Sequence, residues 1–411
     1  YMEFKKWIQG VQDPKLNKTE ATPAFVRLMW RRPKGAVEVI PSAYLVSAWN
    51  QPTYVDETAF PADDRSIGYE RGNAITKQWD DATTRAAVDA ADQVVRRAKE
   101  DQLSDPAKAK ELALGFVSRA FRRPVDPETA KLYVDKQFAS AKDVPAALRR
   151  SVALTLLSPR FLYREIGPSD DPYRMAAEIS FGLWDSLPDP ELLRAAGAGE
   201  LKTPEGRAKQ AKRMAADSRA WTKLRDFLML WLKIDEIPDI VKSQKAFPGF
   251  DDSTATDLRT SLDLFLREVA WGPRADYREL MLSDRQYVNG RLAKIYGGNL
   301  AADAPFQAVA SPDRAGVLTQ PYVMARFAYL EGSSPIHRGV LVARNMLGRV
   351  LAPPPVAVAP TAASLHPELT TRERVALQTK NAPCNTCHGM INPLGFAFEE
   401  YDAIGRVRKV D

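Results

Sequence analysis

Cys384-Asn385-Thr386-Cys387-His388, close to the end of the 411-residue chain, contains both of its cysteines and one of its three histidines. Two residues separate the cysteines and the histidine follows directly, which is the C-x-x-C-H spacing of covalent c-type haem attachment. In that chemistry each thiol adds to one vinyl group of the haem, and the histidine becomes the proximal ligand of the iron. The sequence therefore predicts one covalently attached haem c, with Cys384 and Cys387 as thioether anchors and His388 as the iron ligand.

Two other chemistries use cysteine pairs of this spacing. A thioredoxin-like redox pair normally opens a helix that follows a strand, whereas Pro383 and a polar, helix-like segment precede this motif. A zinc site needs further ligands at regular spacing, and the sequence contains no second Cys or His pair. Both alternatives stay open, although the complete five-residue motif favours haem.

The residues that follow the motif resemble one family. Gly389–Arg406 contains Pro-Leu-Gly-Phe at 393–396, then an acidic and aromatic segment, then a Gly-Arg pair. This order resembles the planctomycete-type cytochrome c proteins, which are assembled from a series of domains of unknown function. Five further stretches resemble the same family: Ala120–Val125, Leu157–Tyr163, Phe181–Asp189, Tyr287–Ala293 and Ser334–Gly339. The resemblance covers the chain from about Phe60 to its end. It implies helical domains followed by a C-terminal haem domain, with a turn at 393–396.

Composition and charge restrict the class of protein. The hydrophobic fraction of 45% is ordinary for a globular protein, and the net charge of +6 is small for this length. No basic run is interleaved with aromatic residues, so we expect no nucleic-acid partner. No transmembrane helix is predicted. The longest uncharged segment, from Val350 to Pro367, is rich in proline and therefore predicts an extended linker rather than a helix. Haem c is attached outside the cytoplasmic membrane, so we expect an exported, periplasmic protein.

The hydrophobic pattern predicts a mainly α-helical protein made of consecutive bundles. Residues 1–80 are irregular, with a short strand expected where apolar residues alternate at 36–40. Helical periodicity then predicts one bundle at 81–168 and a second helical domain at 169–310. The haem-binding helical domain is expected at 311–411.

Individual helices are indicated by their first residues. Ser, Thr or Asp before proline or close to it predicts helices that open near Pro106, Pro127, Pro172 and Pro204. A short helix is expected from Asp284 to Tyr296, because Gly297-Gly298 is a natural helix stop. The Met and aromatic residues at Met214, Trp221 and Trp231 predict core packing rather than a cofactor site.

The iron needs a second axial ligand if the site is closed. Met390 lies two residues beyond His388 on the proximal side, so the distal ligand must come from elsewhere. We favour His337, which precedes a predicted helix of the same domain, although a surface or capping role is equally compatible with a single histidine. The other candidates are Met324 and Met346, which are expected in the core, and His366 in the linker.

Charged residues near the motif suggest further roles. A guanidinium matches the geometry of a carboxylate, so Arg338 and Arg406 are candidates for binding the haem propionates. A surface ion pair is the alternative for both. Glu399, Glu400 and Asp402 form an acidic cluster, for which a solvated turn or a capping role is favoured over acid–base catalysis.

The predicted function is one-electron transfer by an exported monohaem cytochrome. The chain is far longer than a haem-carrying module needs, so we expect it to contact a redox partner protein within a larger redox assembly. The alternatives are a haem oxidoreductase of peroxidase or oxygenase type, with an open distal position, and a scaffold or binding subunit in which the haem is structural.

Overall fold

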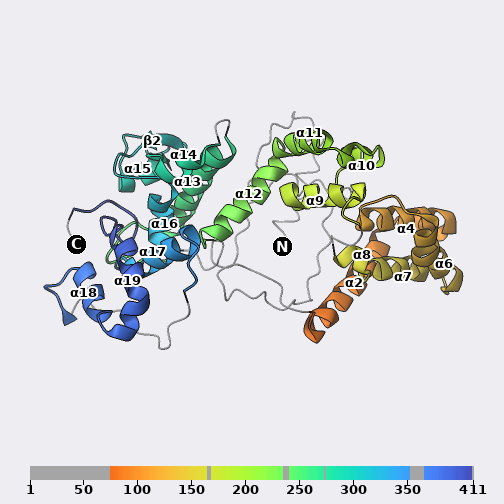
Figure 1. Ribbon diagram of the computed structural model, residues 1–411, viewed down its shortest axis with the longest axis horizontal. Helices are drawn as coiled ribbons and strands as arrows, with labels where there is room; N and C mark the ends of the chain where they lie inside the picture. The colour runs from red at the N-terminus through yellow and green to blue at the C-terminus, as the bar shows by residue number, and fades with distance from the viewer. Residues whose placement is uncertain (1–74, 164–167, 235–239, 273–274, 352–364, 410–411) are drawn as a thin grey trace. The chain divides into compact units, whose positions relative to one another are not determined.

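The computed structural model describes residues 75–163, 168–234, 240–272, 275–351 and 365–409 (Figure 1). Within these ranges the protein is mainly α-helical, as predicted. The chain divides into two compact units, one at 87–222 and one that contains 223–409 together with 75–86. The expected strand at 36–40 lies outside the described residues, as does nearly all of the region 1–80.

Most of the elements before residue 222 belong to the first unit. They are α2 (Lys77–Arg97), α3 (Glu100–Ser104), α4 (Pro106–Phe121), α5 (Pro127–Ala130), the π-helical η2 (Lys131–Asp135), α6 (Lys136–Ser140), α7 (Val144–Leu156), α8 (Pro159–Leu162), α9 (Pro172–Trp184), α10 (Pro190–Gly197), the 3-10 turn η3 (Glu200–Lys202), α11 (Pro204–Ala215) and α12 (Ser218–Trp231). The first helix, α2, begins in the second unit, and α12 ends in it.

The second unit contains a small sheet as well as helices. Its elements are α13 (Asp252–Trp271), α14 (Tyr277–Leu282), β1 (Arg285–Val288), α15 (Gly290–Tyr296), β2 (Gln307–Ala310), the 3-10 turn η4 (Val317–Thr319), α16 (Pro321–Arg326), α17 (Pro335–Leu341), the π-helical η5 (Val342–Met346), α18 (Thr371–Gln378) and α19 (Ala382–Phe396).

The predicted helix starts are confirmed. At Asp105, Asp126, Asp171 and Thr203 the side chain accepts a hydrogen bond from a backbone N–H of the first turn, and proline follows in the first turn. Each such cap stabilises a helix by about 1 kcal/mol. These helix starts are therefore determined by residues that are close to one another in the sequence.

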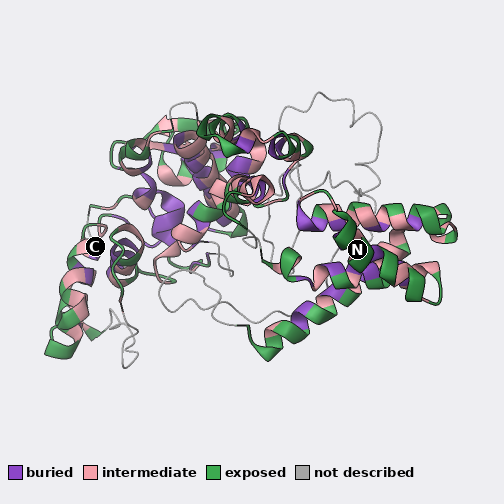
Figure 2. Ribbon diagram, turned by 45° about the vertical axis from the view of Figure 1, so that its right-hand side comes forward, coloured by how far each residue is buried: buried purple, intermediate pink, exposed green. Residues whose placement is uncertain are grey.

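Apolar helix faces build two cores in the first unit. One core joins α2, α4 and α7 through Ala91, Val117 and Leu148. The other includes Trp184 and Met214, whose side chains are fully buried or nearly so. Figure 2 shows this alternation of buried and exposed faces along the helices. Core packing, as predicted, accounts for Met214.

The second unit is organised around α13. Leu258, Leu262 and Phe265 lie in the core, and α13 contacts α14, β1, α15 and α16. The expected domain boundary at 310 does not coincide with a boundary between the two units, because residues on both sides of it belong to the second unit.

One expected helix is wrong in its first half. Residues 285–288 form β1, which pairs antiparallel with β2 in the register Arg285↔Ala310 and Val288↔Gln307. Their burial alternates, with Gln286 and Val288 inward, which is the period of a strand rather than of a helix. The helix begins only after Asn289, whose side chain caps it by accepting from the backbone N–H of Leu292.

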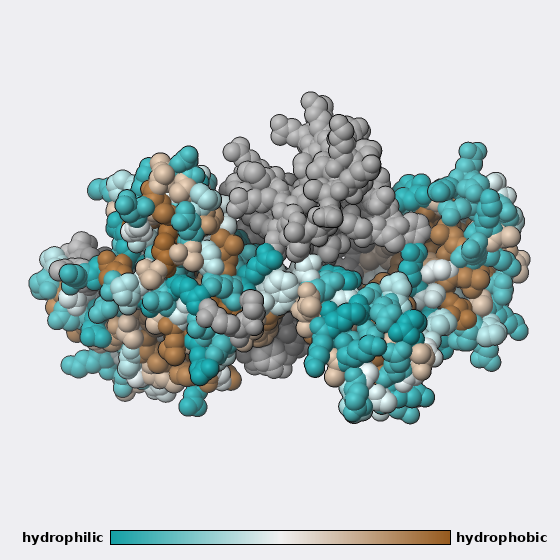
Figure 3. All heavy atoms as spheres, turned by 90° about the horizontal axis from the view of Figure 1, so that it is seen from above, coloured by the Kyte–Doolittle hydropathy of each residue, from teal (hydrophilic) through white to brown (hydrophobic). Residues whose placement is uncertain are grey.

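The surface is mixed. The face drawn in Figure 3 is mostly hydrophilic, with hydrophobic atoms in scattered patches. Among the described residues, no helix combines the length and the apolar character needed to cross a membrane.

Candidate functional site

Helix α19 contains the whole C-x-x-C-H motif. Cys384, Cys387 and His388 follow one another at i, i+3 and i+4, so they lie on one side of the helix. All three side chains are partly exposed, and both cysteines are free thiols. The resemblance implied a turn at 393–396, but α19 continues to Phe396 with Pro393 inside it. We call Cys384, Cys387 and His388 the motif face.

A chain of hydrogen bonds fixes the imidazole of His388. Its Nδ1 lies 3.0 Å from Asn392 Oδ1, Asn392 Nδ2 donates to Thr379 Oγ1 at 2.8 Å, and Thr379 Oγ1 lies 2.8 Å from the carbonyl of Val375. We call these four residues the histidine relay. Asn392 and Thr379 are buried, so water does not compete freely for their hydrogen bonds.

The histidine relay determines the tautomer of His388. The Thr379 hydroxyl has one proton, which it donates to the carbonyl of Val375, so it can only accept from the amide nitrogen of Asn392. The amide oxygen therefore faces His388, and since it can only accept, Nδ1 carries the proton. The lone pair is then on Nε2, which is the form of histidine that binds a metal.

These residues fit a covalently attached haem. Two thiols and a correctly protonated imidazole lie on one helix side. Aliphatic side chains that can pack on a porphyrin are exposed at Leu347, the C-cap residue of η5, and at Leu377 in α18, and these are the two elements that contact α19 beside α17. Among the described residues no group of three or more His, Cys, Asp or Glu side chains converges as at a bound metal ion.

Two glycines bring α17 and α19 into close contact (Figure 1). A Cβ on Gly395 would lie 1.9 Å from the carbonyl oxygen of Pro335, and a Cβ on Gly339 would lie 2.1 Å from that of Ile391. The pairs Pro335–Gly395 and Gly339–Ile391 show that the two helices run antiparallel. Residues after Gly339 therefore lie progressively nearer to the motif face.

The structure does not bring His337 to His388. His337 lies between Pro335 and Gly339, level with the C-terminal half of α19, and about 200° around the helix from Pro335. Its ring contacts Tyr329, with 5.2 Å between ring centroids. Its imidazole reaches solvent, but removal of water by the surrounding protein, and then the charge of Arg326, lower its pKa.

The other three candidates for the distal ligand differ in their position relative to the motif face. Met324 is buried, and a Cβ on Gly405 would lie 3.1 Å from its Cβ. His366 precedes α18, whose first turn lies at the C-terminal end of α19, since the guanidinium of Arg372 is 4.9 Å from the Phe396 ring. Met346 ends η5, which continues α17 toward the motif face and contacts α19.

The guanidinium of Arg338 forms hydrogen bonds with backbone carbonyl groups. Its side chain is 0% exposed, although an ion pair at the surface was one expectation. It donates to the carbonyls of Met324, Phe398, Tyr401 and Asp402, at distances of 2.7–3.2 Å. Burial lowers its pKa to about 10, so it stays charged at neutral pH. These contacts favour a structural role, in which Arg338 anchors the loop after α19, over propionate binding.

Arg406 and the acidic cluster also have partners within the protein. Arg406 Nε lies 2.8 Å from Asp402 Oδ2, and its side chain is half exposed. Asp402 Oδ1 accepts from the backbone N–H groups of Ile404 and Arg406, which closes a turn. Glu399 pairs with Arg408 and accepts from Ser333. Arg406 therefore forms a surface ion pair, which was the alternative to propionate binding. Binding of a haem propionate by Arg406 stays a hypothesis.

Sequence reasoning missed Asn392 and Thr379. Asn392 follows His388 by four residues, a spacing at which helical side chains meet, so this partner was visible in the sequence. Thr379 follows another helix, α18, as its C-cap residue and had no such signal.

Two family models match the chain. Residues 171–297 match PSD4, described as a protein of unknown function (DUF1592), and residues 314–411 match PSCyt3, described as a protein of unknown function (DUF1588). These names imply planctomycete cytochrome c-type domains. No curated protein and no solved structure matches the chain.

Proposed function

We propose that this chain is an exported monohaem c-type cytochrome that transfers single electrons to or from a redox partner protein, within a larger redox assembly. The observation that supports this most is the motif face, where two free thiols accompany an imidazole whose Nε2 has a lone pair. A bound haem c supplies a one-electron iron couple. The name of the model matched by 314–411 agrees with a cytochrome domain.

The residues of the chain have separate tasks in this proposal. Cys384 and Cys387 anchor the porphyrin, which fixes its position relative to α19. His388 supplies the proximal nitrogen. Asn392 orients the imidazole by accepting a hydrogen bond from Nδ1–H of His388. This hydrogen bond makes Nε2 a stronger electron donor to the iron, which stabilises the oxidised form of the haem.

We also propose Met346, in place of His337, as the distal ligand. The antiparallel contact through Gly339 and Gly395 supports this, because η5 continues toward the motif face while His337 is turned away from it. A thioether ligand would close the site, which suits electron transfer rather than peroxide or oxygen chemistry.

The first experiment is an optical spectrum of the protein purified from a host competent for haem c maturation, oxidised and reduced, with and without carbon monoxide. We expect a reduced c-type spectrum that carbon monoxide does not change, and a mass increase of one haem that survives denaturation. The Cys384→Ala, Cys387→Ala variant should lose the covalent haem, whereas Thr386→Ala, between the cysteines, should keep it.

Other outcomes separate the alternatives. A spectrum that shifts with carbon monoxide in the unaltered protein would move the oxidoreductase ahead of electron transfer. A haem that exchanges no electrons with small redox mediators would favour a structural role for the haem. Absence of any haem after expression in that host would remove the proposal and return the motif to a zinc or thiol role.

A further inference from the structure

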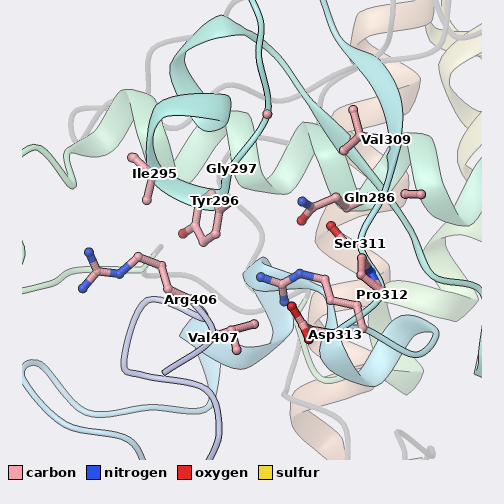
Figure 4. Close-up of a pocket in the computed structure, with 13 residues that line it drawn as sticks. Gln286, Ile295, Tyr296, Gly297, Val309, Ser311, Pro312, Asp313, Arg406 and Val407 are labelled. Carbon is pink, nitrogen blue, oxygen red and sulfur yellow. The ribbon is translucent and has the colours of Figure 1, made fainter. Parts of the chain in front are cut away.

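A cavity of about 400 Å³ lies in the second unit, apart from the motif face (Figure 4). Its walls come from β1, the end of α15, β2 with the loop after it, and the segment that follows Gly405. It therefore joins the two segments that match different family models, since Tyr296 belongs to one and Val407 to the other. Cavities of this size hold small molecules.

Three polar side chains that line this cavity can bind a ligand through hydrogen bonds, namely Gln286, Ser311 and Asp313. Gln286 is the most informative, because it is 2% exposed and its Oε1 is fully buried without a partner. Figure 4 shows the amide of Gln286 pointing toward Tyr296 across the cavity.

The unpaired amide indicates what would bind. A buried polar group without a partner costs about 1–3 kcal/mol, and such groups are rare in folded proteins. The amide of Gln286 can donate and accept at the same time. A hydroxyl-rich ligand offers donors and acceptors to this amide, to the hydroxyl of Ser311 and to the carboxylate of Asp313.

The opposite wall is aromatic and aliphatic. Tyr296 donates its hydroxyl to the carbonyl of Ile404 at 2.7 Å, so the ring face rather than the hydroxyl is offered to a ligand. Burial raises the pKa of Tyr296, which keeps this hydroxyl protonated. Val309 and Val407 extend the apolar surface. Such a wall suits the C–H face of a sugar ring.

The charges around the cavity are balanced. Arg314 donates to the carbonyls of Thr319 and Gly405, and it faces the negative charge of Asp313. Arg406 pairs with Asp402, and Figure 4 shows its side chain pointing away from Tyr296. The cavity therefore has no excess of positive charge that would favour an anionic ligand.

We propose that this cavity binds a neutral, polyhydroxylated small molecule of the size of a monosaccharide. Gln286 fixes its orientation by accepting from one hydroxyl and donating to another. Tyr296 packs against the ring, and Ser311 and Asp313 bind at the opening. The proposal is independent of haem attachment.

The test is calorimetric titration of the full, haem-loaded chain with methyl β-D-glucoside and methyl β-D-galactoside, and with D-glucuronate and inorganic sulfate as anions. We expect saturable binding of at least one neutral glycoside, with a Kd on the order of 1 mM. Gln286→Met keeps the volume and removes both hydrogen bonds, so its affinity should fall at least tenfold. Its melting temperature should stay equal or rise, because an unpaired amide is gone.

Gln307→Met is the matched control, because Gln307 lies on the paired strand, is exposed and does not line the cavity. Its affinity should equal that of the unaltered chain. The proposal is overturned if neither glycoside saturates, if an anion binds more tightly than both, or if folded Gln286→Met binds a glycoside as well as Gln307→Met does.

Discussion

A substitution of Asn392 changes the electron density on the imidazole of His388 but leaves the two cysteine anchors, Cys384 and Cys387, unaltered. In Asn392→Leu the imidazole Nδ1 loses its acceptor, Nε2 becomes a weaker donor, and the oxidised iron is less stabilised. The reduction potential should therefore rise. In Asn392→Asp a carboxylate replaces the amide oxygen, the hydrogen bond becomes charge-assisted, and the potential should fall.

The size of the effect follows from the strength of one hydrogen bond. The potential shifts by the difference in hydrogen-bond strength between the oxidised and reduced states. A net contribution of about 0.5–1.5 kcal/mol therefore sets an upper limit of about 20–60 mV for a one-electron couple, since 59 mV is a tenfold change. The Asp variant should shift by a similar or larger amount in the opposite direction, because hydrogen bonds to charged groups are about twice as strong.

The assay is a spectroelectrochemical titration at fixed pH and ionic strength. Asn385→Leu is the control, because Asn385 is exposed on the same helix and makes no contact with the histidine relay, so its potential should move by less than about 10 mV. The reasoning fails if the Leu and Asp variants shift in the same direction, or if neither differs from the control.

Four further substitutions test the rest of the structure. Met346→Ala should open the iron to carbon monoxide while His337→Ala should not; the reverse pattern in optical spectra would restore His337 as the distal ligand. Gly395→Ala places a methyl group against the carbonyl of Pro335 and should reduce the free energy of unfolding by about 1–3 kcal/mol in urea titrations; an unchanged value would contradict the close contact. Burial, and then the charge of Arg338, lower the pKa of Lys242 to about 7. Its unfolded form binds a proton that the folded form lacks between about pH 7 and 10, so stability falls as pH falls through that window. Lys242→Met should flatten this slope, and an equal slope in both proteins would refute the assignment.

The sequence predicted those features that depend on neighbours along the chain. Asp105 and Thr203 cap their helices because the capping group and its partner lie within three residues of one another. The motif spacing identified both thiols and His388 for the same reason, although the helix that contains them was not predicted. Such features need no knowledge of the tertiary structure.

Features that depend on distant residues were missed. Residues 285–288 are a strand because Gln307–Ala310 supplies its partner across α15, and the four residues alone are too short to show a period. Arg338 was expected at a propionate or at the surface, because no pattern near it announces the carbonyls of Phe398 and Tyr401, some sixty residues later. Burial of a charge is set by the groups that reach it.

Helix α19 is not an independent module within the second unit. Arg314 donates to the carbonyl of Gly405, and Tyr296 donates to that of Ile404, so the loop after α19 is held from both matched segments. A fragment limited to 314–411 would keep Cys384 and His388 but lose the contact from Tyr296. The fragment keeps the hydrogen bonds from Arg314 and Arg338 to this loop, so we expect covalent haem attachment to survive truncation. We expect the loss of the Tyr296 contact to lower the free energy of unfolding. A purified fragment that kept the reduction potential and the unfolding free energy of the full chain would contradict this dependence.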